Sequence, residues 1–151
     1  MLRNLLRAAG LAVALGLVTA APAHAYTWRA SPAKAMWASY QGKNAAGAYG
    51  TWYVNTSTNR VTFYPNVYAA QTGYGGAYAQ ASMSVSADGH SWRAGPQLKT
   101  PKWNHRSWHE LPKAGTLPGT SSYVKTLVSV ALDRPLAADP MHTVAIPAQR
   151  Y

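Results

Sequence analysis

The chain has 151 residues, and 14 lysines and arginines against four acidic residues give it a formal net charge of +10 at neutral pH. It contains no cysteine, which excludes a disulfide-stabilised scaffold and thiol chemistry. The length suits a single domain with one hydrophobic core. A protein this basic is attracted to wall polymers, acidic polysaccharides, anionic lipid or extracellular nucleic acid, unless the charge only maintains solubility.

The beginning of the chain has the pattern of a secretory signal peptide. Arg3 and Arg7 supply a positive start, an apolar run follows, and Ala23-His24-Ala25 forms an A-x-A cleavage site. The run is shorter than the roughly 20 residues of a membrane-spanning helix, so we expect cleavage rather than a retained anchor. The predicted organisation is a signal helix over residues 1–25 and one domain over residues 26–151. Because cleavage removes two of the 14 basic residues and none of the four acids, the domain has a net charge of about +8.

The first part of the predicted domain has no single clear pattern. Ser31-Pro32 favours a short helix over residues 31–38, because serine caps helices and proline suits the first helical position. The aromatic residues Trp28, Trp37 and Tyr40 are equally consistent with strand pairing. Residues 45–50 are small and predict neither a helix nor a strand.

A period of two begins after Gly50. Residues 51–54 and 60–64 are rich in strand-forming side chains, and the polar residues 55–59 between them predict the loop of a hairpin. We expect Pro65 to end the second strand, because proline cannot donate a hydrogen bond to a ladder. Residues 67–70 then predict an edge strand.

The clearest strand covers Tyr78 to Ser86, where apolar residues alternate with serine and glutamine. Asp88-Gly89 predicts a tight turn in which the aspartate is a turn former rather than a catalytic acid. The string from Ser86 to Trp92, S-x-D-G-x-x-W, resembles hairpin turns of discoidin-like and other carbohydrate-binding sandwiches. The resemblance covers seven residues and implies a β-sandwich.

The last third of the chain predicts two more strands. Tyr123 to Leu132 is a long strand with branched aliphatic residues on one side, and we expect it to be central in its sheet. Asp133-Arg134-Pro135 ends it, Asp139-Pro140 marks a turn, and His142 to Ile146 forms a final strand. The predicted fold is all-β: an antiparallel two-sheet sandwich of about six to eight strands.

The segment Lys99–Pro112 concentrates aromatic, basic and histidine side chains outside any clear strand pattern. Indole faces stack on sugar rings or nucleobases, and interleaved cations attract anionic polymers. We therefore predict a presented loop that contacts a ligand. Its predicted ligand-binding residues are Lys99, Lys102, Trp103, His105, Arg106, Trp108 and His109. The alternative is a structural flap whose tryptophans belong to the core and whose charges are solvated.

The exposure of two tryptophans separates these interpretations. Exposure of Trp103 and Trp108 on one face, beside Lys102 and Arg106, would favour the contact role. Burial of both indoles would favour the flap, because a buried side chain cannot reach a ligand.

The histidines of this segment do not predict a metal site. His105 and His109 are four residues apart and Glu110 is adjacent, which on a helix would resemble the spacing of H-E-x-x-H zinc sites. The inner glutamate is absent, no third ligand is apparent and the segment has no helical pattern, so we predict neither a metal nor a cofactor. The two histidines instead add positive charge under acidic conditions.

Catalysis has little support in the sequence. Glycosidases commonly use two facing carboxylates, and Asp88, Asp133 and Asp139 all occupy turn-like positions, which leaves Glu110. There is no G-x-S-x-G motif, although a Ser-His-Asp triad assembles in space and cannot be read from sequence. We therefore expect a binding protein rather than an enzyme.

These patterns lead to one functional hypothesis and two alternatives. The favoured hypothesis is a secreted, extracellular module, associated with the cell wall, that binds an anionic polymer and above all a cell-wall polysaccharide. The first alternative is a bacteriocin-like antagonist that acts on the envelope of competing cells. The second is a domain that binds or inhibits a protein partner through a proline-bracketed loop. No apolar run after the signal is long enough to predict a transmembrane segment.

Overall fold

The structure is a computed structural model that describes residues 23–151. Most of the predicted signal peptide, residues 1–22, lies outside the described residues. Apart from one short 3₁₀ turn, every regular element of the described chain is a strand, which confirms the predicted all-β class. In chain order the elements are β1 (Ala23–Arg29), the 3₁₀ turn η1 (Pro32–Lys34), β2 (Met36–Tyr40), β3 (Lys43–Asn55), β4 (Arg60–Ala69), β5 (Gly76–Ser86), β6 (Arg93–Lys99), β7 (His109–Glu110), β8 (Lys113–Thr116), β9 (Tyr123–Asp133) and β10 (Met141–Arg150).

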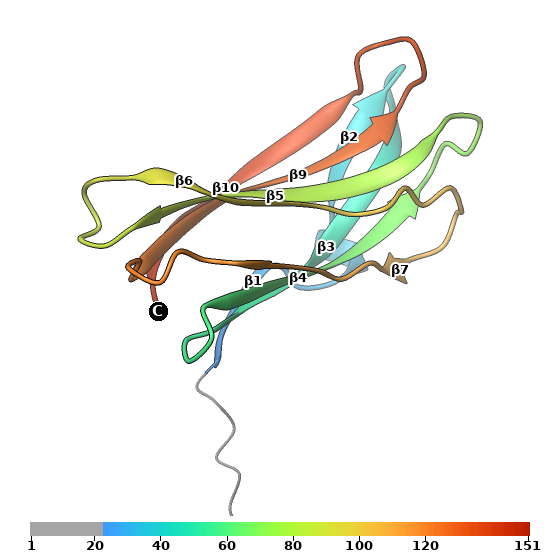
Figure 1. The fold of residues 1–151 in the computed structure, drawn as a ribbon. Coiled ribbons are helices and arrows are strands. Elements are labelled where there is room, and N and C mark those ends of the chain that lie inside the picture. The colour runs from blue at the N-terminus through green and yellow to red at the C-terminus, as the bar shows by residue number, and fades with distance from the viewer. Residues whose placement is uncertain (1–22) are drawn as a thin grey trace, which may run out of the picture.

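Two antiparallel sheets face each other across one core (Figure 1). Sheet A has the order β1-β3-β4-β7, with β2 also beside β3 and β8 also beside β4. Sheet B has the order β10-β9-β5-β6. The strand count exceeds the expected six to eight because each edge of sheet A is divided between two short strands. The predicted antiparallel two-sheet sandwich is confirmed.

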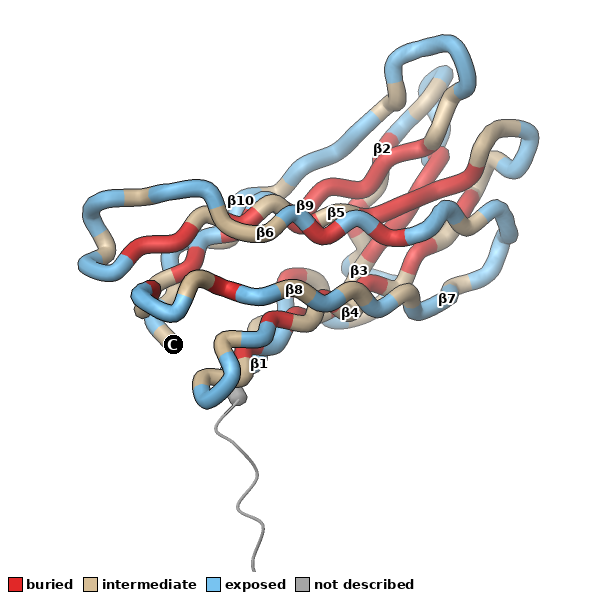
Figure 2. The backbone as a smooth tube through the Cα atoms, viewed as in Figure 1, coloured by how far each residue is buried: buried red, intermediate tan, exposed pale blue. Residues whose placement is uncertain are grey.

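The core lies between the sheets and is built by alternation along the strands. In β4 every second residue from Val61 to Ala69 is buried, and Figure 2 shows buried stretches on both sheets. The largest fully buried side chains are Trp52 and Phe63 of sheet A. Sheet B contributes smaller residues, such as Leu132 of β9. Since burying one large apolar side chain contributes about 1.5–3 kcal/mol, this packing holds the cysteine-free chain together.

The helix predicted over residues 31–38 is wrong beyond its first turn. Ser31 precedes the 3₁₀ turn η1 with proline at its start, as expected, but Ala35 leaves the helical region with φ −57° and ψ 146°. The chain continues as β2, in which Met36 and Ala38 are buried and Trp37 faces outward. Buried and outward side chains alternate here as in a strand, which agrees with the alternative prediction of strand pairing.

Pro65 does not end the second hairpin strand, contrary to the prediction. β4 continues to Ala69 and is paired on both sides, so the predicted edge strand is part of an inner strand. On one side β8 pairs as far as Phe63 and β7 begins opposite Asn66, so Pro65 lies where the pairing passes between them. Its carbonyl accepts a hydrogen bond from the Leu111 amide at 2.9 Å. A proline is tolerated at this position because the ladder is interrupted there.

The Asp88 turn between β5 and β6 follows the prediction. The Asp88 Oδ1 atom accepts hydrogen bonds from the backbone amides of His90 and Ser91, each at 2.8 Å, and from the Ser86 hydroxyl at 2.8 Å. These donors, with Ser91 contributing most, hold the pKa of the Asp88 carboxyl well below its usual range. Asp88 is a turn former, as expected.

The sandwich is closed on one side and open on the other. A Cβ atom added at Gly115 of β8 would collide with Leu98 and would touch Pro96, both of β6. The two sheets are therefore in contact there. Between β1 and β10 a cleft of about 430 Å³ remains, and at one end the Tyr26 hydroxyl donates to the Arg150 carbonyl at 3.0 Å. The part of the chain that the structure describes contains no helix with the length and apolarity that crossing a bilayer requires.

Candidate functional site

The segment Lys99–Pro112 connects the two sheets at one end of the sandwich (gold in Figure 1). It leaves β6 in sheet B and enters β7 and β8 at the edge of sheet A. Trp103 and Ala77 of β5 exchange two backbone hydrogen bonds of 2.8 Å, and the His105 carbonyl accepts a bond from Ala69 of β4 at 3.2 Å. The segment is therefore fixed to both sheets by its backbone, and it contains the short strand β7, which the sequence did not predict.

Trp103 is half-buried and packs against the core. Its indole stacks on His109, with ring centroids 4.2 Å apart and an angle of 14° between the planes, and lies 4.6 Å from His105. The indole Nε1 donates to the carbonyl of Ser107 at 2.8 Å. These contacts fold the segment around Trp103, so this tryptophan has a structural role at the end of the sandwich.

Trp108 is also half-buried, but it lies on the opposite side of sheet A. His109 is in register with the buried Val67, so the residue before it points outward. The Trp108 ring is 4.9 Å from Tyr49, 5.1 Å from Tyr68 and 5.7 Å from Trp37. The two tryptophans therefore do not form one surface, and neither is fully exposed or fully buried.

The cations predicted for this site already have partners within the chain. Lys102 forms an ion pair of 2.7 Å with Asp133. The Lys99 ammonium lies 4.0 Å from the centre of the Tyr78 ring, and Arg106 Nε donates to the Ala70 carbonyl at 3.1 Å. These cations still contribute to the positive electrostatic potential of the protein, but each one contacts a group of the same chain.

The environment of Tyr78 shows how the same end of the molecule is stabilised. The Tyr78 hydroxyl donates to Asp139 Oδ2 at 2.7 Å, and the other carboxylate oxygen of Asp139 accepts from the Arg134 amide at 2.9 Å. Burial, followed by the bond to Asp139, raises the pKa of Tyr78. Burial opposes ionisation of Asp139 too, but the Arg134 amide, the Tyr78 hydroxyl and the nearby lysines outweigh it and lower its pKa.

The outer face of sheet A carries a group of aromatic side chains that sequence reasoning did not assign to a site. We call this group the aromatic face. It consists of Trp37, Tyr49, Tyr53, Tyr64, Tyr68 and Trp108. Four segments supply it: β2, β3, β4 and the residue before β7. At every second position of residues 49–53 and 62–68, tyrosine alternates with threonine or asparagine. This pattern is the sequence signal from which the group could have been predicted.

The rings of the aromatic face pack mainly edge to face. Tyr53 and Tyr64 are 5.3 Å apart with planes at 82°, and Trp37 meets Tyr68 at 75°. All six side chains remain partly exposed, and Tyr53 is 40 % exposed. Edge-to-face contacts restrain each ring while leaving part of it open to solvent.

Polar side chains are interleaved with these rings. Thr51 is in register with Tyr64, and Thr62 with Tyr53, so both threonines point outward between tyrosines. Asn66 is in register with Tyr49 on one side and with Glu110 of β7 on the other. The arrangement combines ring surfaces with hydrogen-bonding groups on an open, extended face.

The acidic and histidine side chains mostly serve structure. Asp88, Asp133 and Asp139 hold turns or pair with a lysine, as described above, and His105 and His109 flank Trp103. Within residues 23–151, no three histidine or acidic side chains gather closely enough to hold a metal ion. No model of a protein family, no curated protein and no solved structure matches this chain.

Proposed function

We propose that this protein is a secreted module that binds an anionic cell-wall polysaccharide through the aromatic face. The observation that carries the proposal is the set of six partly exposed rings on one open sheet face, interleaved with threonine and asparagine. A pyranose ring has an apolar C–H face and hydroxyls around its rim. Aromatic rings cover the C–H face, and short polar side chains donate hydrogen bonds to the hydroxyls and accept hydrogen bonds from them.

The polymer is expected to be anionic because of the charge of the whole domain. The 14 basic residues of the chain outnumber its four acids, and removal of the signal peptide changes this balance little. On the aromatic face itself, Arg60 and Glu110 have opposite signs. Stacking therefore acts at the face, while the net charge acts at longer range and is screened by salt.

Co-sedimentation with purified wall polysaccharide tests the proposal. We expect binding that weakens as salt is raised, and we expect Tyr53→Ser/Tyr64→Ser to weaken it at least about tenfold, the loss of roughly 1.4 kcal/mol. Leu136→Ser is the matched control, because Leu136 is fully exposed in the turn between β9 and β10. Equal binding by the double variant and the control would overturn the proposal. Dye release from lipid vesicles by the wild type would instead support the antagonist.

Secretion is part of the same proposal and has its own test. Cleavage after Ala25 would leave Tyr26 as the first residue, still stacked on Trp52 with ring centroids 4.2 Å apart. Residues 26–29 of β1 would keep their pairing with β3. Mass spectrometry of protein from the culture medium should therefore give an N-terminus at Tyr26. An intact N-terminus on cell-bound protein would contradict export by cleavage.

A further inference from the structure

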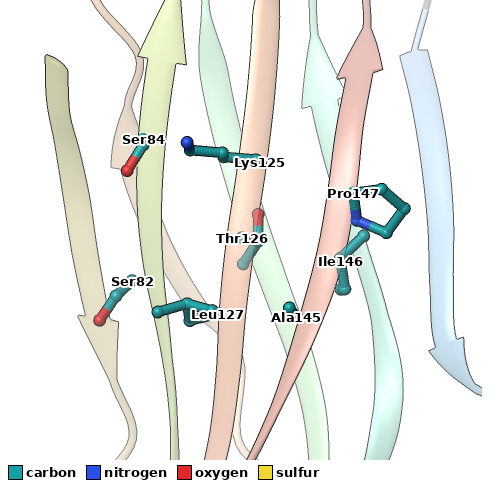
Figure 3. A pocket seen from close by; sticks show the side chains of 8 residues that line it. All are labelled: Ser82, Ser84, Lys125, Thr126, Leu127, Ala145, Ile146 and Pro147. Atoms are coloured by element: carbon teal, nitrogen blue, oxygen red, sulfur yellow. The ribbon is translucent and has the colours of Figure 1, made fainter. Parts of the chain in front are cut away.

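The outer face of sheet B contains a groove that is separate from the aromatic face. It has a volume of about 340 Å³ and crosses β5, β9 and β10 (Figure 3). Small side chains on β5, Ser82 and Ser84, leave space between the longer side chains of β9 and the backbone of β10. The volume lies at the low end of the range for small-molecule sites, which suits one ring rather than an extended ligand.

An irregularity in β10 opens this groove. The register between β10 and β9 shifts between Ile146 and Gln149, and Pro147 lies within the shift. Thr126 of β9 is adjacent to the groove, but its side chain is only 2 % exposed and lies on the core side of the strand with Val124 and Val128. The outward side chains at the groove are therefore Lys125 and Leu127 of β9 and Ser82 and Ser84 of β5.

The groove has a polar side and an apolar side. In Figure 3 the Lys125 side chain extends from β9 towards Ser84 of β5, with which it is in register. Leu127, 49 % exposed, and Pro147 provide apolar surface. This combination matches a pyranose, whose C–H groups contact the apolar part while its hydroxyls bond to serines.

Positive charge dominates this end of sheet B. The Lys125 ammonium lies 4.4 Å from the centre of the Trp92 ring, and the Arg150 guanidinium lies 5.9 Å from that of Tyr123. Tyr123 and Lys125 are two positions apart on β9, so both cations are on the same face. None of the four acids of the chain lines the groove, and Asp88, in the neighbouring turn, already accepts bonds from that turn.

We propose that this groove binds a single sugar unit that carries a carboxylate, such as a hexuronate within an acidic polysaccharide. The carboxylate pairs with the Lys125 ammonium, which lies over the Trp92 ring and forms no ion pair within residues 23–151. Ser82 and Ser84 meet the hydroxyls, and Leu127 and Pro147 meet the C–H face. The inference deepens the proposed function, since it names the acidic unit of the polymer, but it rests on a different face and different residues.

An NMR titration with a soluble galacturonate trisaccharide tests this groove, with an uncharged galactose trisaccharide as the comparison ligand. We expect the acidic sugar to shift amide signals of β9 and β10, and Lys125→Gln to weaken its binding about tenfold. Lys102→Gln is the matched control, because it removes the same charge from a lysine that is already paired with Asp133. We expect Lys125→Arg to retain most of the binding.

Two outcomes would overturn the inference. One is equal binding of the acidic and uncharged trisaccharides, and the other is equal weakening by Lys125→Gln and Lys102→Gln. The double variant Tyr53→Ser/Tyr64→Ser separates this inference from the proposed function, because it leaves the groove intact. If the double variant binds the trisaccharide, and also binds wall material as well as the wild type does, the proposed function fails and the groove remains.

Discussion

The outer faces of the two sheets differ although both sheets are built by the same alternation. Sheet A presents tyrosines such as Tyr49 and Tyr68 outward, whereas sheet B presents small polar residues such as Ser82 and Ser84. Their inward sides are similar, since both are apolar and buried. The inward positions define the sandwich, and the outward positions are free to differ because packing does not constrain them. The difference therefore locates two candidate binding surfaces of different chemistry.

Adjacent residues on β4 give the sharpest test of this separation. Phe63 is fully buried in the core, and Tyr64 belongs to the aromatic face. We expect Phe63→Ala to lower the free energy of unfolding by about 3–5 kcal/mol, and Tyr64→Ala to lower it by less than about 2 kcal/mol. Urea denaturation measures both. A larger loss for Tyr64→Ala would mean that the outer face also carries the stability of the fold.

Gly47→Ala changes the aromatic face without removing a ring. A Cβ atom at Gly47 would lie 2.7 Å from the Trp37 ring, so the indole must move. We expect about tenfold weaker binding to wall polysaccharide, because Trp37 no longer packs against Trp108 and Tyr68. Gly73→Ala is the control, since no atom lies within 4 Å of its added Cβ. Unchanged binding by Gly47→Ala would show that Trp37 is not part of the binding surface.

The two lysines Lys102 and Lys125 should behave differently. Lys102 is half exposed and paired with Asp133, so Lys102→Gln should lower the free energy of unfolding by at most about 1 kcal/mol. That loss should shrink at high salt, because exposed charges are screened. Thermal unfolding at low and high salt measures the effect. A loss that does not depend on salt would show that the lysine stem, rather than the ion pair, stabilises this end of the sandwich.

The smallest effect concerns pH and the turn at Asp88. Because the folded-state pKa of Asp88 is depressed, its contribution to stability is present above the ordinary carboxyl pKa, near 4, and is lost as the pH falls through and below that value. Asp88→Asn should therefore reduce stability at neutral pH and flatten the acid limb of the stability profile. Unfolding at a series of pH values measures both. An acid limb as steep in Asp88→Asn as in the wild type would contradict this role.

The sequence predicted those strands that alternate clearly between apolar and polar residues. β5 and β9 have that pattern, and the Asp88 turn has its usual residues, so all three lie where expected. The first half of β3 was not predicted, because alanines and glycines have no strong strand preference. Gly47 is required there for a reason that only tertiary structure reveals, since the Trp37 ring occupies the space of its side chain.

The candidate site could be predicted only in part. The sequence identified Trp103 and Trp108 as unusual, but it could not show that they lie on opposite sides of sheet A. That depends on the pairing of β7 with β4, a contact between residues distant in the chain. The same limit applies to Lys102, whose partner Asp133 comes from the end of β9. Local patterns find candidate residues, whereas long-range register decides which of them share a surface.

The hydrogen bond from Tyr26 to Arg150 brings the first and last strands together at one end of the sandwich. The aromatic face is remote in sequence from this junction, whereas the groove on sheet B includes Pro147, which precedes Arg150 on the same strand. A short peptide that joins the two ends, with new ends opened at the exposed turn around Leu136, should give a circular permutant with the same two sheets. The same geometry allows the domain to be displayed in series with others while its aromatic face stays accessible.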